Sequence, residues 1–501
     1  MLVALMSGVK NITAVEVNPD TVEFMKEYSA YNGGLYTNFP NVKVVTAEGR
    51  NYLRQQTEKY DIIMLSIPVT KTSRSPEGFA LTENFLFTKN SIADYYDHLT
   101  ENGRLVIVTH GPEEVMRLMS LSHSVLDNRG ITATEVMNRT YTLGSHMGGV
   151  FVLSKNNINP NESYLEHQAL HAANMEPVIS YLPYIKTTSN ANHIQQALFD
   201  QCQMLNPALI AMSQGVLSQA NLVRGLASMG LNVSAVTDES PFFYNFEVGI
   251  PGTLSSALTL SLLFVLAVIL VPYFLSRKRT EHKHGSGKKH VGSAGAFPIL
   301  FALLGIGFML AEIPLIQRFT LFLGEPVLSV SVLLFSLLIG AGIGGLTSSR
   351  VSPNGLAKKT SFTAIGVASL LVLYAFVTPA ILKQFLGLTL VERSLLSAAL
   401  LIPLGFALGF PFPLGIRLMR ERGRDSYIPW IWGINGSASV LGSVLAIVLA
   451  MKVGFAWAMV VGAICYVVAW LTLYMVSHAV EQKPGYARIV TVSATRDTQS
   501  R

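Results

Sequence analysis

The chain changes character near residue 250, and this change constrains its architecture more than any other feature. The residues before it alternate between short apolar stretches and amphipathic ones. The residues after it contain apolar segments long enough to cross a lipid bilayer, which takes about 20 residues of helix. With 50% hydrophobic and 14% charged residues among 501, the chain is too apolar for an ordinary soluble enzyme. The sequence therefore predicts an α/β region joined to an all-α membrane region, and so an integral membrane protein in contact with lipid.

The α/β half has strands separated by helices. The sequence predicts strands at 12–17, 42–46, 61–66 and 104–109, with helices at 20–32, 51–57, 84–98 and 112–127. Strands that alternate with helices in this way predict a doubly wound, mostly parallel sheet, which is a Rossmann-like fold. We expect a hairpin of 131–137 and 149–154 at its edge. The predicted domains are 1–155 for the sheet, 156–249 for a mostly helical extension, 250–478 for the membrane domain and 479–501 for a polar tail.

Seven segments in the second half have the length and apolarity of membrane spans: 252–275, 296–316, 326–346, 362–382, 394–416, 430–451 and 455–477. The basic residues are unequally divided between the loops on the two sides of the membrane. Thirteen lie within loops 277–291, 350–361 and 417–428, and four lie on the opposite side, at Arg318, Lys383, Arg393 and Lys452. Such a bias predicts that these three loops and the C-terminus are cytoplasmic. Because long domains are a poor guide to orientation, the side of residues 1–249 is left open. The charge pattern does not resemble a nucleic-acid footprint.

Three residues follow the first two strands of the predicted sheet. Glu16 ends the first strand, and Glu48 and Gly49 come directly after the second. In such sheets ligands bind at the carboxyl ends of the strands. A carboxylate at the position of Glu16 can accept both hydroxyls of a ribose, and one at Glu48 can meet an adenine amino group. The alternative is that both are solvated loop acids. Four histidines, at 98, 110, 123 and 146, are scattered without the spacing of metal ligands, so we expect no metal site.

Longer strings carry a family resemblance. VKNITAVEVNP (9–19), VVTAEGRNYL (44–53) and YDIIMLS (60–66) resemble spermidine synthases and class I methyltransferases. Four further strings look more like the bacterial membrane-fused spermidine synthase-like proteins: FALTENFLFTKNSIADYYDHLTENGRLVIVTH (79–110), VTDESPFFYNF (236–246), GFMLAEIPLIQRFTLFLGEP (307–326) and WGINGSASVLGS (432–443). The resemblance implies transfer of an aminopropyl or methyl group from S-adenosylmethionine or its decarboxylated form. It also implies a small amine or other acceptor and a bacterial inner-membrane location, and it leaves an oligomer open.

The sequence departs from the family in two places. The family's opening strand and glycine-rich turn precede the first helix, whereas this chain begins inside that helix. We therefore expect an N-terminally truncated sheet that lacks a central strand. The family's paired acids after the fourth strand are replaced by Ser66-Ile67-Pro68-Val69, and the next carboxylate is Glu77. Activation of an amine by the family's route is therefore in doubt, the catalytic residues are left unassigned, and an inactive product is one alternative.

The membrane half contains a few polar residues of interest. Glu312 lies within a predicted span, and either reaches the interface beside Gln317 or lines a polar cavity with Asn435. Clustered glycines predict close helix packing in lipid. Gly405, Gly409, Pro411 and Pro413 predict a broken fifth span. Because broken helices also line transporter sites, the second functional hypothesis is a transporter or scaffold with a degenerate nucleotide-binding domain.

Overall fold

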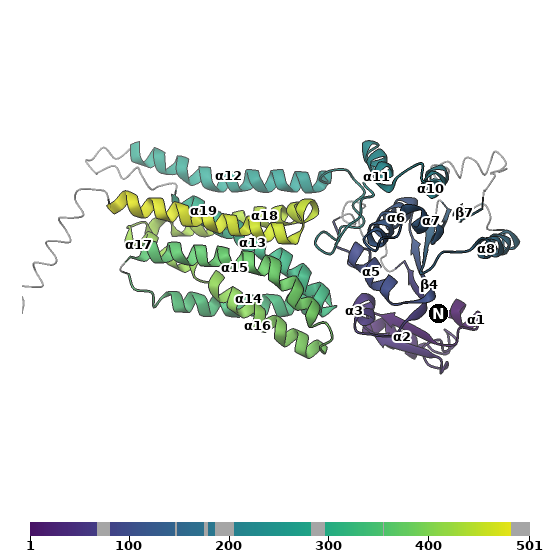
Figure 1. The fold of residues 1–501 in the computed structure, drawn as a ribbon. Coiled ribbons are helices and arrows are strands. Elements are labelled where there is room, and N and C mark those ends of the chain that lie inside the picture. The colour runs from purple at the N-terminus through teal and green to yellow at the C-terminus, as the bar shows by residue number, and fades with distance from the viewer. Residues whose placement is uncertain are drawn as a thin grey trace, which may run out of the picture. The chain divides into compact units, whose positions relative to one another are not determined.

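We describe the protein from a computed structural model, which defines residues 1–67, 81–145, 148–174, 179–185, 205–281, 296–353 and 355–481. The chain divides into two compact units, Met1–Pro251 and Gly252–Arg501 (Figure 1). Each unit is described by itself. Glu77, His146, Cys202, most of the loop 277–291 and most of the tail 479–501 lie outside the described residues.

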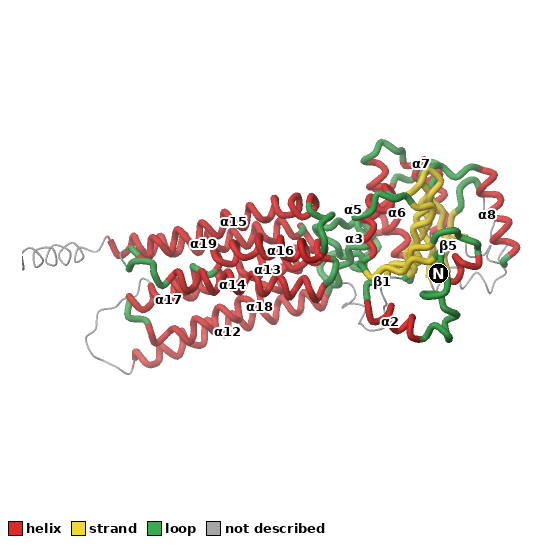
Figure 2. The backbone as a smooth tube through the Cα atoms, turned by 90° about the horizontal axis from the view of Figure 1, so that it is seen from below, coloured by secondary structure: helices red, strands yellow, loops and turns green. Residues whose placement is uncertain are grey.

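The first unit contains two sheets (Figure 2). A two-stranded parallel sheet joins β1 (Ile12–Glu16) to β2 (Val42–Thr46). A five-stranded sheet has the order β3-β4-β6-β5-β7, and its strands are Tyr60–Ser66, Leu99–Thr109, Gly148–Ser154, Thr140–Ser145 and Ile179–Tyr181. β3 and β4 run parallel, and the other three pairings are antiparallel. The predicted Rossmann-like alternation is confirmed, and the larger sheet is mixed.

Four strand edges carry no partner among the described residues, those of β1, β2, β3 and β7. β1 pairs with β2 alone, and β3 pairs with β4 alone. On β3, Ile62 and Met64 are each 59% exposed although both are apolar. In the described part of the chain, β1 and β3 therefore belong to two separate sheets, and the truncation of the sheet stays a prediction.

Local signals explain where the helices of this unit begin. Asn18 caps α2 (Pro19–Glu27) by accepting a hydrogen bond from the amide of Asp20, and Thr88 caps α5 (Lys89–Asp97) through a capping box with Ser91. The remaining helices are α1 (Leu2–Met6), α3 (Gly49–Arg54), α6 (Pro112–Asp127), α7 (Ala133–Asn138), α8 (Pro160–Ala172), α10 (Leu205–Ser213) and α11 (Gln219–Ser228).

One predicted element is wrong. We expected a strand at 131–137, but this segment contains α7, and the strand that pairs with β6 is β5, which starts at Thr140. The cause is a capping box, in which Thr132 and Glu135 satisfy each other's backbone amides and start a helix. The short strand β7 was not predicted at all.

The core of the unit lies around α6, which packs on β4 and β6. Arg117 of this helix is fully buried, and its guanidinium donates to the backbone carbonyls of Asn232, Phe242, Phe243 and Asn245. Burial lowers the pKa of Arg117 to about 9. Four carbonyl acceptors thus hold the segment 232–246 against the sheet domain.

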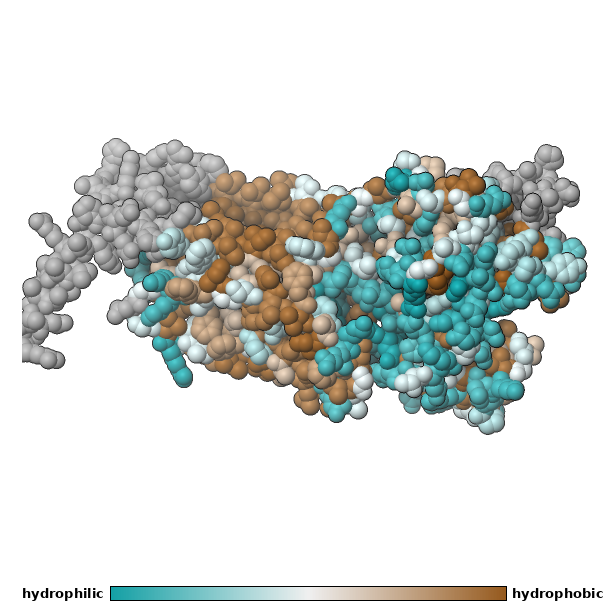
Figure 3. Space-filling model, viewed as in Figure 1, coloured by the Kyte–Doolittle hydropathy of each residue, from teal (hydrophilic) through white to brown (hydrophobic). Residues whose placement is uncertain are grey.

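In the described part of the second unit, the α-helices are α12 (Gly252–Glu281), α13 (Ala296–Leu323), α14 (Pro326–Ser348), α15 (Leu356–Gln384), α16 (Leu390–Leu408), α17 (Pro411–Glu421), α18 (Ile428–Val453) and α19 (Phe455–Glu481). Among the described residues seven spans are long and apolar enough to cross a membrane, with α16 and α17 forming one of them. The break between α16 and α17 falls at Gly409–Phe410, so the broken fifth span is confirmed. Figure 3 shows that apolar residues dominate the visible surface of these helices.

Glycines let α14 and α16 approach each other closely. A Cβ on Gly340 or Gly344 would collide with the backbone of α16, and one on Gly405 or Gly409 would collide with the backbone of α14. Both pairs are spaced by four residues, which places them on one face of each helix. The predicted role of these glycines in packing is confirmed.

The assignment of Arg318 and Arg393 to loops is wrong. Both lie inside helices, α13 and α16, and each is only 6% exposed. Arg318 donates to the carbonyl of Tyr374 and Arg393 to that of Phe322. A guanidinium near a helix end can reach backbone carbonyls, which explains why residues that look like loop charges are buried.

Candidate functional site

A cavity of about 430 Å³ lies between the open edges of β1 and β3. It follows both strands, because its lining includes Thr13 to Val17 on the first and Tyr60 to Ser66 on the second. The carboxyl ends of these two strands, with the start of α3, form its polar end. Its walls are otherwise mostly aliphatic and aromatic. A cavity of this size and lining is of the kind that takes a small organic ligand.

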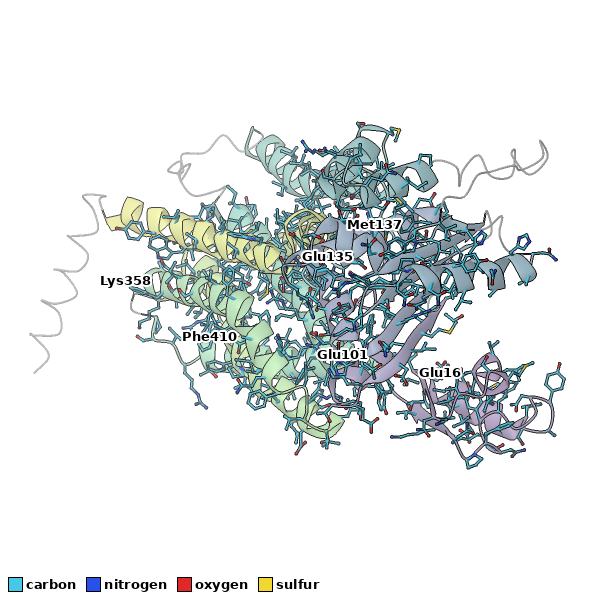
Figure 4. The ribbon with its side chains drawn as sticks, turned by 45° about the vertical axis from the view of Figure 1, so that its right-hand side comes forward. Glu16, Glu101, Glu135, Met137, Lys358 and Phe410 are labelled. Carbon is cyan, nitrogen blue, oxygen red and sulfur yellow. The ribbon has the colours of Figure 1, made fainter. Side chains whose placement is uncertain are left out.

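Glu16 lies at the carboxyl end of β1 and lines this cavity (Figure 4). Its Oε1 accepts a hydrogen bond from the amide of Asn18 at 2.9 Å, which closes the turn into α2. Desolvation raises the pKa of Tyr36, and the negative charge of Glu16 raises it further. The strand register places Glu16 opposite Thr46, the last residue of β2.

Glu48 follows β2 and is the N-cap of α3. Its Oε1 accepts from the amide of Arg50 at 3.0 Å, and its Oε2 accepts from the amide of Asn51 at 2.7 Å. The carboxylate is therefore held in place by the helix that it caps, and each oxygen keeps a second lone pair for a ligand. Gly49 starts the helix, and a Cβ there would meet nothing within 4 Å, so the backbone is open to an approaching molecule. Glu16, Glu48 and Gly49 all line the same cavity.

Sequence reasoning named only Glu16, Glu48 and Gly49 of the residues that line the cavity, and three of those that it missed connect distant parts of the chain. Arg50, Leu86 and Tyr95 all line it, from α3, from the turn before α5 and from α5 itself. The hydroxyl of Tyr95 donates to the carbonyl of Leu86 at 3.0 Å, which fixes the two relative to each other. All three belong to strings that carried the family resemblance, and this is the signal that could have found them. Arg50 is held by acids far away in sequence, which no local pattern reveals.

The polar residues predicted within the membrane bundle do not come together. The side-chain amide of Asn435 donates to the carbonyl of Phe301 at 2.9 Å, and its backbone lies against Gly305. Glu312 is half-buried and lies seven residues further along α13 than Gly305, or about 10 Å at 1.5 Å per residue. Gln317 is also half-buried. Asn435 thus joins two packed helices, as polar residues do in membrane bundles.

The first unit has a Rossmann-like fold with a cavity at its strand ends, and comparison with known proteins shows what this domain is similar to. Residues 3–164 match the family of the spermine/spermidine synthase domain, so the N-terminal region of this chain is such a domain.

Two curated relatives are polyamine aminopropyltransferases. The one from Sodalis glossinidius (strain morsitans) is 34% identical over 100 residues, which are 20% of this chain and 31% of that protein. The one from Serratia proteamaculans (strain 568) is 40% identical over 58 residues, which are 11% of this chain and 20% of that protein. The chain thus spans less than a third of the length of each relative.

Among solved structures, the spermidine synthase from Thermotoga maritima aligns at 16% identity and a TM-score of 0.22. The alignment covers 42% of this chain and 60% of that one. At this TM-score the alignment does not bear on the function.

Proposed function

We propose that this protein is a membrane-embedded aminopropyltransferase whose donor binds at the polar end of the cavity between β1 and β3. The observation that carries the proposal is the convergence of Glu16, Glu48 and Gly49 on one cavity, within a spermine/spermidine synthase domain. Glu16 would accept the ribose hydroxyls, and Glu48 the adenine amino group. The helices after residue 251 would hold the enzyme in a bilayer, in contact with lipid.

The charge of the site favours a cationic donor. Glu16 and Glu48 bring negative charge to the cavity, and the guanidinium of Arg50 is already paired with Asp94 and Asp238. The decarboxylated form of S-adenosylmethionine lacks a carboxylate and so carries one more net positive charge, which the two acids attract more strongly. We therefore propose decarboxylated S-adenosylmethionine as the donor and a small amine as the acceptor.

The proposed reaction is a nucleophilic substitution. The neutral acceptor nitrogen forms a bond to the aminopropyl carbon next to the donor's sulfonium sulfur. The carbon–sulfur bond breaks, its electron pair stays on sulfur, and methylthioadenosine leaves. The nitrogen loses a proton, which requires a base near the carboxyl end of β3. The next carboxylate along the chain is Glu77, which lies outside the described residues.

The transporter alternative depends on polar residues that converge inside the bundle. Glu312 and Asn435 lie apart, and Asn435 is engaged with the backbone of the neighbouring helix. These two residues therefore offer no common site, and the enzyme is the better supported function.

Isothermal titration of the full-length protein in lipid nanodiscs tests the proposal. The ligands are decarboxylated S-adenosylmethionine, S-adenosylmethionine and methylthioadenosine, and the first two form a matched pair that differs by one carboxylate. We expect the decarboxylated form to bind more tightly. Mass spectrometry with short diamines then tests for an aminopropylated product. Absence of binding by all three ligands would remove the enzymatic function.

A further inference from the structure

The guanidinium of Arg50 joins three parts of the first unit at the wall of the cavity. Its side chain is 1% exposed. Nε donates to Oδ2 of Asp94 on α5 at 2.8 Å, and Nη1 donates to the carbonyl of Phe85 at 2.8 Å. Nη1 and Nη2 also form a fork on the two carboxylate oxygens of Asp238, at 2.8 and 2.9 Å. Four hydrogen bonds therefore connect the first turn of α3 to segments 35 to 188 positions away.

Asp238 is itself part of a hydrogen-bonded assembly. Oδ1 accepts from the hydroxyl of Thr88 at 2.7 Å, and its amide donates to the side chain of Asn90 at 3.1 Å. The amide of Lys89 donates to the carbonyl of Val236 at 2.8 Å. Hydrogen bonds thus join residues 84–90 and 236–241 into one wall of the fold, of which Leu86 lines the cavity, and Arg50 is the point at which this wall meets α3.

The charges in this assembly depend on one another. Burial alone lowers the pKa of the Arg50 guanidinium, but the two aspartates more than offset this and hold the pKa above its usual value. The cation is therefore retained because Asp94 and Asp238 surround it. Removing the fork on Asp238 would leave a buried carboxylate with only part of its partners.

We propose that Arg50 is a positioning residue that sets the orientation of Glu48 through the wall formed by residues 84–90 and 236–241. The carboxylate of Glu48 is bound by the amides of Arg50 and Asn51, so it moves with the first turn of α3. The side chain of Arg50 holds this turn against Asp238. Occupancy of the cavity and order in the segment 236–241 are coupled by this connection. The coupling to a ligand rests on the proposed function, whereas the positioning of Glu48 does not.

The decisive variant is Arg50→Lys, made in the full-length protein in nanodiscs. Lysine keeps the positive charge but cannot form the fork on Asp238 or reach four acceptors at once. The matched control is Arg129→Lys. Arg129 also forms a fork, on Asp97 at 2.6 and 3.0 Å, but this pair is largely exposed and does not line the cavity.

The first readout is amide hydrogen exchange at residue resolution. If Arg50 positions Glu48, then Arg50→Lys speeds exchange at the amides of residues 50 and 51, which Glu48 caps, and in the segment 236–241. It leaves the core amides of α6 unchanged, and Arg129→Lys has neither effect. A uniform increase across the whole unit, or no increase at residues 50 and 51, would overturn the proposal, because a merely structural ion pair acts on stability as a whole.

The second readout is the affinity for methylthioadenosine. Arg50→Lys should weaken binding at least about tenfold, which corresponds to about 1.4 kcal/mol. Asp238→Asn should also weaken binding. The double variant should bind about as tightly as whichever single variant has the lower affinity, because both substitutions act through one connection. Full additivity would contradict the coupling.

The two readouts separate this inference from the function. If the unmodified protein binds none of the three adenosyl ligands, the proposed function fails, and exchange at residues 50 and 51 still decides the positioning role. If it binds and Arg50→Lys binds equally well, the function stands and this inference fails.

Discussion

Replacing Glu16 by alanine is the most direct test of the proposed donor site. Two ribose hydroxyls on one carboxylate would form two charge-assisted hydrogen bonds, each worth about 1.5–3 kcal/mol when well formed. Water and neighbouring groups recover part of this when the carboxylate is removed. We therefore expect Glu16→Ala to lose at least about 1.4 kcal/mol of binding free energy, which corresponds to a tenfold higher dissociation constant. Glu16→Gln retains an oxygen acceptor but not the charge, so its affinity should lie between that of the unmodified protein and that of Glu16→Ala.

The structure makes this variant cleaner than the corresponding change at Glu48. Glu16 is half-buried, and its side chain makes a hydrogen bond to the amide of Asn18, within an exposed turn. Because the acceptor is charged but the turn is exposed to water, this bond contributes about 1.5 kcal/mol to folding, the low end of the range for a bond to a charged group. Glu48 caps α3 with both oxygens, so its loss also weakens the helix start by about 0.5–2 kcal/mol. An affinity change at Glu48 would therefore mix two effects.

The assay is isothermal titration with methylthioadenosine on full-length protein in nanodiscs. The control is Glu23→Ala, which removes the same charge from an exposed position on α2 that does not line the cavity. It should leave the dissociation constant unchanged. Equal affinity of the unmodified protein and Glu16→Ala would show that the ribose is not held at the end of β1, and would refute the placement of the donor.

Three further outcomes follow from other parts of the molecule. Gly344→Ala should destabilise the bundle by about 1–3 kcal/mol, because its Cβ would collide with the backbone of α16. The control is Gly342→Ala, whose Cβ would meet nothing within 4 Å and which should not destabilise the bundle. Denaturant titration in detergent compares the two variants. Burial lowers the pKa of His123 to about 4, so the unfolded chain binds its proton first as pH falls below about 6.5. The free energy of unfolding should then drop by about 2 kcal/mol between pH 7.5 and 5. The drop, measured by hydrogen exchange in α6, should be smaller in His123→Gln than in the unmodified protein. Single cysteines placed at Lys358 and Arg420 should label from the same side of the membrane, and labelling from opposite sides would contradict the predicted topology.

The regular elements of the first unit could be predicted because their signals are local. The strands at 12–17, 42–46 and 61–66 appear as β1, β2 and β3, and the helix at 112–127 appears as α6 with the same bounds. The segment 131–137 failed because its alternating apolar residues suit a strand, while the side chains of Thr132 and Glu135 favour a helix start. Capping decided the outcome, since it satisfies backbone groups that a strand there would have left to another partner.

Some residues of the candidate site could be predicted from the sequence and others could not. Glu16, Glu48 and Gly49 could be proposed from the sequence because each comes directly after a strand, and parallel strands bring their carboxyl ends to one edge. Arg50 could not, because its meaning depends on Asp94 and Asp238, which are 44 and 188 positions away. A single sequence does not show which distant acids a buried cation meets. Only the folded chain shows that Arg50, next to a predicted site, pairs with both of these acids.

In the membrane unit, too, a single sequence does not show which partners a charged side chain meets. The sequence assigned Arg318 and Arg393 to loops because both lie near the ends of apolar segments, yet each is buried and bound to a backbone carbonyl. Arg393 donates to Phe322 in the last turn of α13, where unpaired carbonyls favour a cation. Arg318 donates to Tyr374 within α15, so both arginines are bound inside the bundle rather than facing water. Arg417, one of the thirteen basic residues on the other side, likewise donates to the carbonyls of Ser348 and Val351, so contacts of this kind occur on both sides. The cytoplasmic placement of loops 277–291, 350–361 and 417–428 therefore stays a prediction from the charge bias of the sequence.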